Sequence, residues 1–173
     1  IFTNDDALAI RLKMMANHGQ SKKYVHQIIG LNSRLDSIQA AVLRVKLKNL
    51  KDFENARNMV ASHYDKNLES LPLQVPKRVS NSTHVFHQYT LTLASEELRN
   101  RVRQALAAQG VQSMIYYPRP LHLHPAYRSE RFPDGSFPVS EQLSCRVLSL
   151  PIHSEMTEAV ALEISAIIRE ACS

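Results

Sequence analysis

The chain contains one segment in which a loop leads directly into a helix: Gly30-Leu31-Asn32-Ser33-Arg34-Leu35-Asp36-Ser37-Ile38-Gln39-Ala40-Ala41. Ser33 and Asp36 have the spacing of a capping box, so we expect Ser33 to be the N-cap of this helix. A helix N-terminus binds anions such as phosphate, because its first N–H groups are free and the helix dipole is positive there. Asn32 can donate an amide hydrogen bond at such a site, and Arg34 can bind a carboxylate or phosphate through two N–H groups.

A second interpretation of this segment needs no ligand. Ser33 and Asp36 then only cap the helix, and Arg34 forms a structural ion pair. Capping boxes are common in helices, so the pattern alone favours this interpretation over an anion site.

The residues before this segment predict the end of a strand followed by a short helix. Ile1-Phe2 is typical of a strand end, and Thr3 with Asp6 predicts a capped helix start. Apolar residues then recur at helical spacing as far as Asn17, and a loop is expected over residues 20–31. Because the chain opens in mid-strand, we expect more protein before it.

The residues after this segment predict a long helix and then a compact α/β unit. Residues 31–71 contain neither Gly nor Pro, so the helix either breaks near Asp52 or links two domains and packs on a partner subunit. Pro72 and Pro76 end the helix and begin a connector. The unit beyond the connector is expected to contain strands at 85–93, 111–117 and 147–150 and helices beginning at Ser95, Pro138 and Thr157.

Two tyrosines and two histidines are further candidates for a site. Tyr116 and Tyr117 precede a rigid Pro-x-Pro loop that could hold their hydroxyls at the rim of a pocket; alternatively, one ring packs in the core. His122 and His124 have the spacing of two metal ligands on a strand, but no cluster of Cys, Asp or Glu accompanies them. We therefore expect no metal site.

Composition narrows the class of protein. The 173 residues are 44% hydrophobic and 21% charged, as in globular chains, and no apolar run approaches the length of a membrane span. Two cysteines are too few for a disulfide framework, which favours a reducing, cytoplasmic setting. The four glycines form neither a GxGxxG motif nor a P-loop, so Rossmann-type and Walker-type nucleotide binding find no support. The formal charge of +5 suits anionic partners such as phosphates, nucleotides or nucleic acids.

Seven segments, in order along nearly the whole chain, carry a resemblance to one family. The chain resembles the C-terminal half of the DegT/DnrJ/EryC1/StrS sugar aminotransferases, which are pyridoxal-phosphate enzymes of fold type I. The matching segments are Ile1–Asp5, Asn17-His18-Gly19, Tyr24-x-His26, Gly30–Ala41, His87-Gln88-Tyr89, Tyr117-Pro118-x-Pro120-Leu121-His122 and Val147–His153. The resemblance implies an α/β fold with three parts. Residues 1–30 would end the large cofactor-binding domain, 31–76 would form a long interdomain helical segment and connector, and 77–173 would form the small α/β domain.

The resemblance also implies an activity. Such an enzyme transfers an amino group from L-glutamate to a nucleotide-linked keto sugar, with pyridoxal 5'-phosphate as cofactor, on a cytoplasmic homodimer with shared active sites. From the resemblance we expect the chain to belong to the subgroup of UDP-2-acetamido-2-deoxy-3-oxo-glucuronate aminotransferases. The expected substrate is therefore a UDP-3-keto-hexuronate used in O-antigen, lipopolysaccharide or related bacterial surface sugars.

Four residues fall on family positions with a role. Asn32 matches the asparagine that reaches the cofactor phosphate of the neighbouring subunit, and Arg34 matches an arginine that approaches the sugar across the dimer. Tyr117 matches a family tyrosine, whereas Tyr116 stands where relatives often have His; both are expected to bind substrate.

No catalytic residue of the family is found in these residues. The Schiff-base lysine and the aspartate that pairs with the pyridine nitrogen are expected upstream, and Lys13, Lys22 and Lys23 do not occupy the lysine motif. The chain alone is therefore expected to be inactive. The competing hypothesis is a non-catalytic basic module that binds RNA or another anion, although RNP-type aromatics and a KH-type GxxG loop are absent.

Overall fold

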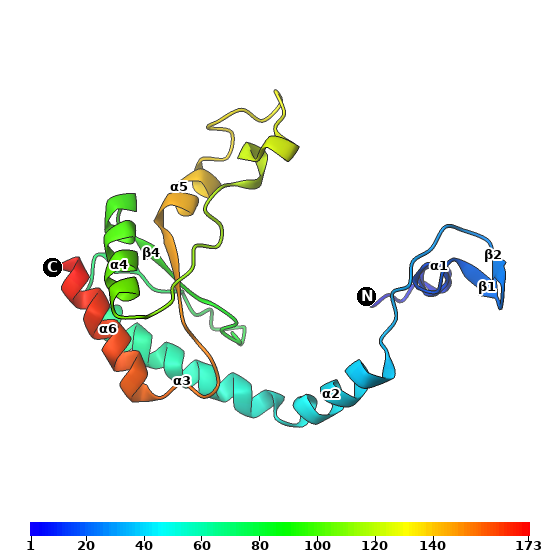
Figure 1. The fold of residues 1–173 in the computed structure, drawn as a ribbon, viewed down its shortest axis with the longest axis horizontal. Coiled ribbons are helices and arrows are strands. Elements are labelled where there is room, and N and C mark those ends of the chain that lie inside the picture. Colours follow the sequence, from blue (N-terminus) through cyan, green and yellow to red (C-terminus); the bar gives the residue numbers. More distant parts are fainter. The chain divides into compact units, whose positions relative to one another are not determined.

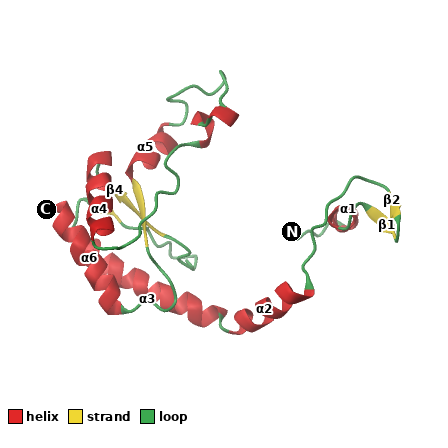
Figure 2. Cartoon of the chain, in the orientation of Figure 1, coloured by secondary structure: helices red, strands yellow, loops and turns green.

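The computed structural model describes residues 1–173, which form two compact units, Ile1–Asn49 and Leu50–Ser173 (Figure 1). Figure 2 shows a mixture of helices, short strands and long loops. No helix combines the length and the apolar composition needed to cross a membrane.

The first unit consists of two helices and a small hairpin. Helix α1 (Asp6–Ala16) begins at Asp5, whose carboxylate accepts a hydrogen bond from the N–H of Leu8 at 2.9 Å. Strands β1 (Gln20–Lys22) and β2 (Val25–His26) pair antiparallel. Helix α2 (Ser37–Lys48) begins at Asp36, which accepts from the N–H of Gln39 at 2.8 Å.

Several expectations for this unit are wrong. Ile1-Phe2 forms no strand, and Thr3 is not the N-cap of α1; its hydroxyl instead accepts from the N–H of Asp5 at 3.1 Å. Ser33 is not the N-cap of α2, because the helix begins after Asp36; the N–H of Ser33 instead donates to the carbonyl of Ala16 at 3.0 Å. The expected loop over residues 20–31 contains the β1–β2 hairpin.

The long Gly- and Pro-free helix breaks, as one of the two alternatives predicted. Helix α2 ends at Lys48 and α3 (Leu50–Leu68) begins two residues later, with Asn49 between them, three residues before Asp52. The N–H of Asn49 bonds back to the carbonyls of Lys46 and Leu47, which closes α2. The boundary between the two compact units falls at this break.

The second unit is a small antiparallel sheet covered by helices. Strand β4 (Tyr89–Leu93) lies between β3 (Leu73–Gln74) and β5 (Val147–Leu150). Helix α6 (Glu158–Cys172) packs against both α3 and α4 (Glu96–Ala108). Ser95 and Thr157 cap α4 and α6 as expected, and α5 (Pro138–Arg146) begins at the predicted proline. The connections include two short 3-10 helices, η1 (Leu121–Leu123) and η2 (Pro125–Tyr127).

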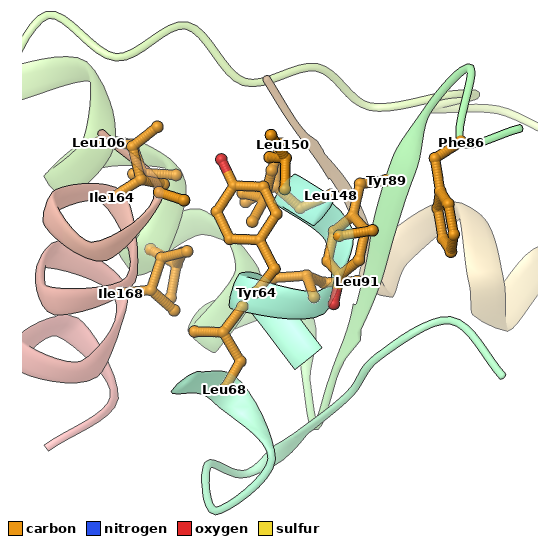
Figure 3. Close-up of a cluster of buried hydrophobic side chains, with 14 of the residues drawn as sticks. Tyr64, Leu68, Phe86, Tyr89, Leu91, Leu106, Leu148, Leu150, Ile164 and Ile168 are labelled. Carbon is orange, nitrogen blue, oxygen red and sulfur yellow. The ribbon is translucent and has the colours of Figure 1, made fainter. Parts of the chain in front are cut away.

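The core of this unit joins α3, the sheet and α6. Figure 3 shows the ring of Tyr64 among apolar side chains of β4, β5 and α6, such as Leu148 and Ile164. The Tyr64 hydroxyl donates to the carbonyl of Pro151 at 3.0 Å, and burial raises the pKa of this phenol. The buried tyrosine thus ties the helix layer to the end of β5.

One expected strand is shorter than the sequence suggests, and another is not formed. Residues 85–88 are not part of β4, because Phe86 has a φ of +44° and its N–H bonds to Nδ1 of His84 at 2.9 Å. Residues 111–117 form no strand; only Met114 makes an isolated bridge to Ser149 of β5. The connector after Pro72 contributes β3, a strand that the sequence did not indicate.

Candidate functional site

Asn32 lies in a loop segment that is bonded along the end of α1. The N–H of Leu31 donates to the carbonyl of Met15 at 2.7 Å, and the N–H of Ser33 donates to the carbonyl of Ala16 at 3.0 Å. Both backbone neighbours of Asn32 are therefore fixed, while its side chain is exposed and forms no hydrogen bond within the chain. The Asn32 amide is free to donate to an external acceptor.

Two glycines allow the loop to approach α1 this closely. A Cβ atom on Gly30 would lie 2.0 Å from the backbone nitrogen of Gly19 and 2.7 Å from the carbonyl oxygen of Met15. A Cβ atom on Gly19, whose φ is +72°, would lie 1.7 Å from the carbonyl oxygen of Ile28. No other residue type fits at either position, so these glycines set the place of Asn32.

Arg34 is held by the end of the same helix. Its Nη1 donates to Oδ1 of Asn17, the residue that follows α1. The remaining N–H groups of the guanidinium are directed by this contact and can bind a second acceptor. The alternative of an ion pair for Arg34 is not found, because its partner is a neutral amide.

The N-terminus of α2 follows the capping interpretation that the pattern favoured, not the anion-site alternative, although the capping residue is Asp36 and not Ser33. Asp36 caps this helix with its own carboxylate, and Asn32 and Arg34 lie four and two residues before the cap. Asn32 and Arg34 lie two residues apart in the loop segment that is hydrogen-bonded to the end of α1.

Tyr116 and Tyr117 line a cavity of about 590 Å³ in the second unit. Their rings meet edge to face with centroids 5.8 Å apart, and since Tyr116 is 38% and Tyr117 75% exposed, neither ring packs in the core. The rest of the wall comes from the following loop, from α5 and from the start of β5: Pro118, Arg119, Pro120, Leu121, His124, Ser140, Leu143, Ser144 and Val147. The interpretation of these tyrosines as residues of a pocket rim agrees with this geometry.

The two histidines with metal-ligand spacing lie in different surroundings. Nε2 of His122 lies 3.0 Å from a carboxylate oxygen of Glu141, and His124 lines the cavity. No group of three or more His, Cys, Asp or Glu side chains is placed to hold a metal ion.

Sequence reasoning missed two residues that support these candidates, Asn17 and Glu141. Asn17 contacts Arg34 across 17 positions, and Glu141 contacts His122 across 19. Neither separation corresponds to a helical or strand period, so no local pattern could have paired them. The four predicted site residues fall into two pairs, one in each unit.

Comparison with known proteins assigns the family. Residues 1–169 match the model of the DegT/DnrJ/EryC1/StrS aminotransferase family. The chain belongs to this family. The resemblance of the seven segments is confirmed at this level, and the chain is thus a member of a family of sugar aminotransferases that depend on pyridoxal phosphate.

Several members of the DegT family are similar over nearly the whole chain. Erythromycin biosynthesis sensory transduction protein EryC1 of Saccharopolyspora erythraea is 40% identical over 170 residues, which are 98% of this chain and 46% of EryC1. The dTDP-3-amino-3,4,6-trideoxy-alpha-D-glucose transaminase of Streptomyces venezuelae is 39% identical over 171 residues, which cover 98% and 44% of the two chains. The UDP-2-acetamido-2-deoxy-3-oxo-D-glucuronate aminotransferase of Pseudomonas aeruginosa is 37% identical over 159 residues, 92% and 43%.

Solved structures of the DegT family confirm the α/β fold. DesV of S. venezuelae superposes with a TM-score of 0.90 at 38% identity, over 99% of this chain and 46% of DesV. A family member from Brucella abortus gives 0.89 at 39% identity, over 99% and 45%. The chain therefore spans a little under half the length of these relatives.

One residue of this chain, Asn32, has the chemistry needed to bind the cofactor of the DegT family. A phosphate group is a strong acceptor, and Asn32 offers an exposed, unpaired amide donor on a fixed backbone. Asn32 would thus hold the phosphate of pyridoxal phosphate, as the resemblance implies.

Proposed function

We propose that this chain forms the C-terminal portion of a pyridoxal-phosphate-dependent aminotransferase that moves an amino group from L-glutamate to a nucleotide-linked keto sugar. The observation that carries the proposal is the family match over residues 1–169. The lysine that binds the cofactor is then supplied by residues outside these 173. We use "the whole enzyme" for the assembly that joins both portions.

The residues of this chain take the binding and orienting roles. Pyridoxal phosphate supplies an electrophilic carbonyl and an electron sink when bound. Asn32 donates its amide N–H to the cofactor phosphate, and Arg34, held by Asn17, donates to an anionic group of the sugar. Tyr116 and Tyr117 orient sugar hydroxyls from the cavity wall.

The proposed acceptor is a 3-keto sugar. Relatives between 36 and 39% identical carry names that place the reacting group at carbon 3 of dTDP-linked or UDP-linked sugars. Among such sugars we favour a UDP-3-keto-hexuronate, because the guanidinium of Arg34 can bind a carboxylate through two hydrogen bonds. Bacterial surface polysaccharides, including O-antigen, are the proposed destination of the product.

The whole enzyme is proposed to be a homodimer with shared active sites. Helix α2 buries none of its residues, and exposed apolar side chains follow one another on one of its faces: Ile38 at 79%, Val42 at 50% and Val45 at 66%. Contiguous apolar surface of this kind marks a place where a protein is covered by another surface.

The test is amination by the whole enzyme. Purified enzyme is incubated with L-glutamate and a panel of UDP-linked and dTDP-linked 3-keto and 4-keto sugars, and the amino sugar is detected by mass spectrometry. Glutamate-dependent amination of a 3-keto sugar nucleotide supports the proposal. Absence of amination across the panel, together with salt-sensitive RNA binding, would favour the basic-module hypothesis instead.

A further inference from the structure

The loop between Leu121 and Phe137 closes on a single carboxylate. Glu141, in the first turn of α5, accepts from the N–H of Gly135 at 3.0 Å and from the N–H of Phe137 at 3.2 Å. Nε2 of His122 lies 3.0 Å from the same carboxylate. Because an ionised carboxylate only accepts hydrogen bonds, Nε2 is the donor.

These contacts join the two ends of a loop. His122 precedes and Gly135 follows residues 123–134, and Glu141 bridges them. The His122 ring is 9% exposed and meets the ring of Phe137 edge-on, with centroids 4.8 Å apart. Figure 1 shows this loop, in yellow, projecting beyond α5 away from the sheet. Its position therefore depends on the contacts of Glu141 at its base.

The base of the loop is also a wall of the cavity. Leu121 and His124 flank His122 in sequence, and both line the cavity. Ser140 and Ser144 of α5 also line the cavity; Ser140 precedes Glu141, and Ser144 lies three residues after it. Glu141 itself is not among the lining residues, so it acts on the cavity only by fixing the base of the loop relative to α5.

We propose that Glu141 is a positioning residue for the nucleotide-sugar substrate: acting through His122, Gly135 and Phe137, it holds the base of the loop, where Leu121 and His124 form part of the cavity wall beside Tyr116 and Tyr117. This inference rests on the proposed function. A wall held in place binds the sugar nucleotide without first being ordered, so loss of the contact weakens substrate binding more than it slows the reaction.

The test compares Glu141→Gln with wild type in the whole enzyme. Glutamine has nearly the same shape but is neutral. Its carbonyl oxygen can replace Oε1, which accepts from His122, Gly135 and Phe137, but these bonds are then no longer charge-assisted, and the NH₂ group that replaces Oε2 cannot accept from Gly135. We expect KM for the sugar nucleotide to rise about tenfold, with kcat within about threefold. KM for L-glutamate, which has no nucleotide to reach the loop, stays within about twofold. General damage to the fold would instead lower kcat and change both KM values.

The matched control is Glu130→Gln. Glu130 lies on the same loop, is exposed and forms no ion pair, so this variant keeps wild-type KM values. A second variant, His122→Gln, removes the ring from the other side of the contact and raises sugar KM in the same direction. If Glu141→Gln does not fold, His122→Gln alone tests the proposal.

Amide hydrogen exchange gives a readout that does not depend on activity. Faster exchange at Gly135 and Phe137 in Glu141→Gln, together with the rise in sugar KM, supports the positioning role. Unchanged sugar KM in both variants would overturn the role while leaving the aminotransferase function intact. Absence of amination by wild type would overturn the proposed function, and the positioning role with it.

Discussion

At the scale of single residues, Asn32 offers the most direct test of the cofactor role. Its side chain is exposed and makes no contact that stabilises the chain, so Asn32→Ala leaves the fold unchanged. A hydrogen bond to a charged group contributes roughly 1.5–3 kcal/mol, so the affinity of the whole enzyme for pyridoxal phosphate falls about ten- to a hundredfold. Titration of the cofactor absorbance measures this change. Ser33→Ala is the neighbouring control, and equal affinities for wild type and Asn32→Ala would contradict the role.

Arg34 tests the preference for a uronate. Lysine keeps the charge, but it lacks the planar fork that can donate to Asn17 and to a carboxylate together. We therefore expect Arg34→Lys to lower kcat/KM for a 3-keto-hexuronate by more than it does for a neutral 3-keto sugar. Paired assays of the two sugars, with the exposed Arg44→Lys as control, measure the difference. The uronate preference is wrong if both sugars lose the same factor.

The carboxylate of Glu141 gives the loop a dependence on pH. The N–H of Phe137, with those of Gly135 and His122, lowers the pKa of Glu141 below its ordinary value of about 4.3. A lowered carboxyl pKa stabilises the folded loop above the ordinary value, and this stabilisation is lost as pH falls through the lowered value. The difference in exchange protection at Gly135 between wild type and Glu141→Gln should shrink as the pH falls below about 4. A difference that persists unchanged at pH 3 would show that the charge is not involved.

At the scale of elements, the contact between Gly19 and Gly30 determines whether the loop can lie along α1. A methyl group at Gly30 would meet three backbone atoms within 2.7 Å, and backbone cannot move aside as a side chain can. We expect Gly30→Ala to displace Asn32 and to reduce cofactor affinity at least as much as Asn32→Ala. Gly110→Ala is the control, because its Cβ would meet nothing within 4 Å, although its φ of +73° adds local strain. Cofactor titration and thermal unfolding separate lost binding from lost stability.

The elements that the sequence predicts well are those with local signals. Ser95 and Thr157 cap α4 and α6, and Pro138 starts α5, because each signal acts within one helical turn. The β1–β2 hairpin has no apolar alternation to reveal it, and β3 has only two residues. Residues 111–117 have the composition of a strand, but only Met114 finds a partner on β5.

The candidate site is predictable only in part. Asn32, Arg34, Tyr116 and Tyr117 stand in segments with a recognisable order of residue types. The side chains that hold those segments in place, Asn17 and Glu141, lie far from them along the chain. Such pairings follow from the folded path of the backbone, which no short pattern encodes.

At the scale of the whole molecule, the exposed apolar side chains of α2 predict a subunit interface. A glutamate at Ile38 would place a charge in this surface, and burying it unpaired costs several kcal/mol. We expect Ile38→Glu to shift the whole enzyme from dimer toward monomer in sedimentation velocity and to reduce activity in parallel. Gln39→Glu adds the same charge at the next position of α2 and serves as control. A monomeric wild-type enzyme with full activity would exclude shared active sites.

The closure of the 123–134 loop at its base has a consequence for how such a protein can diversify. When the two ends of a loop are joined, doubling its length costs only about 0.6 kcal/mol. Insertions, deletions and new sequences at the tip can therefore accumulate while the wall formed by Leu121 and His124 keeps its place. A longer tip can then contact larger or differently substituted sugars. A short peptide tag or fluorescent label inserted at the tip should leave the cavity unchanged.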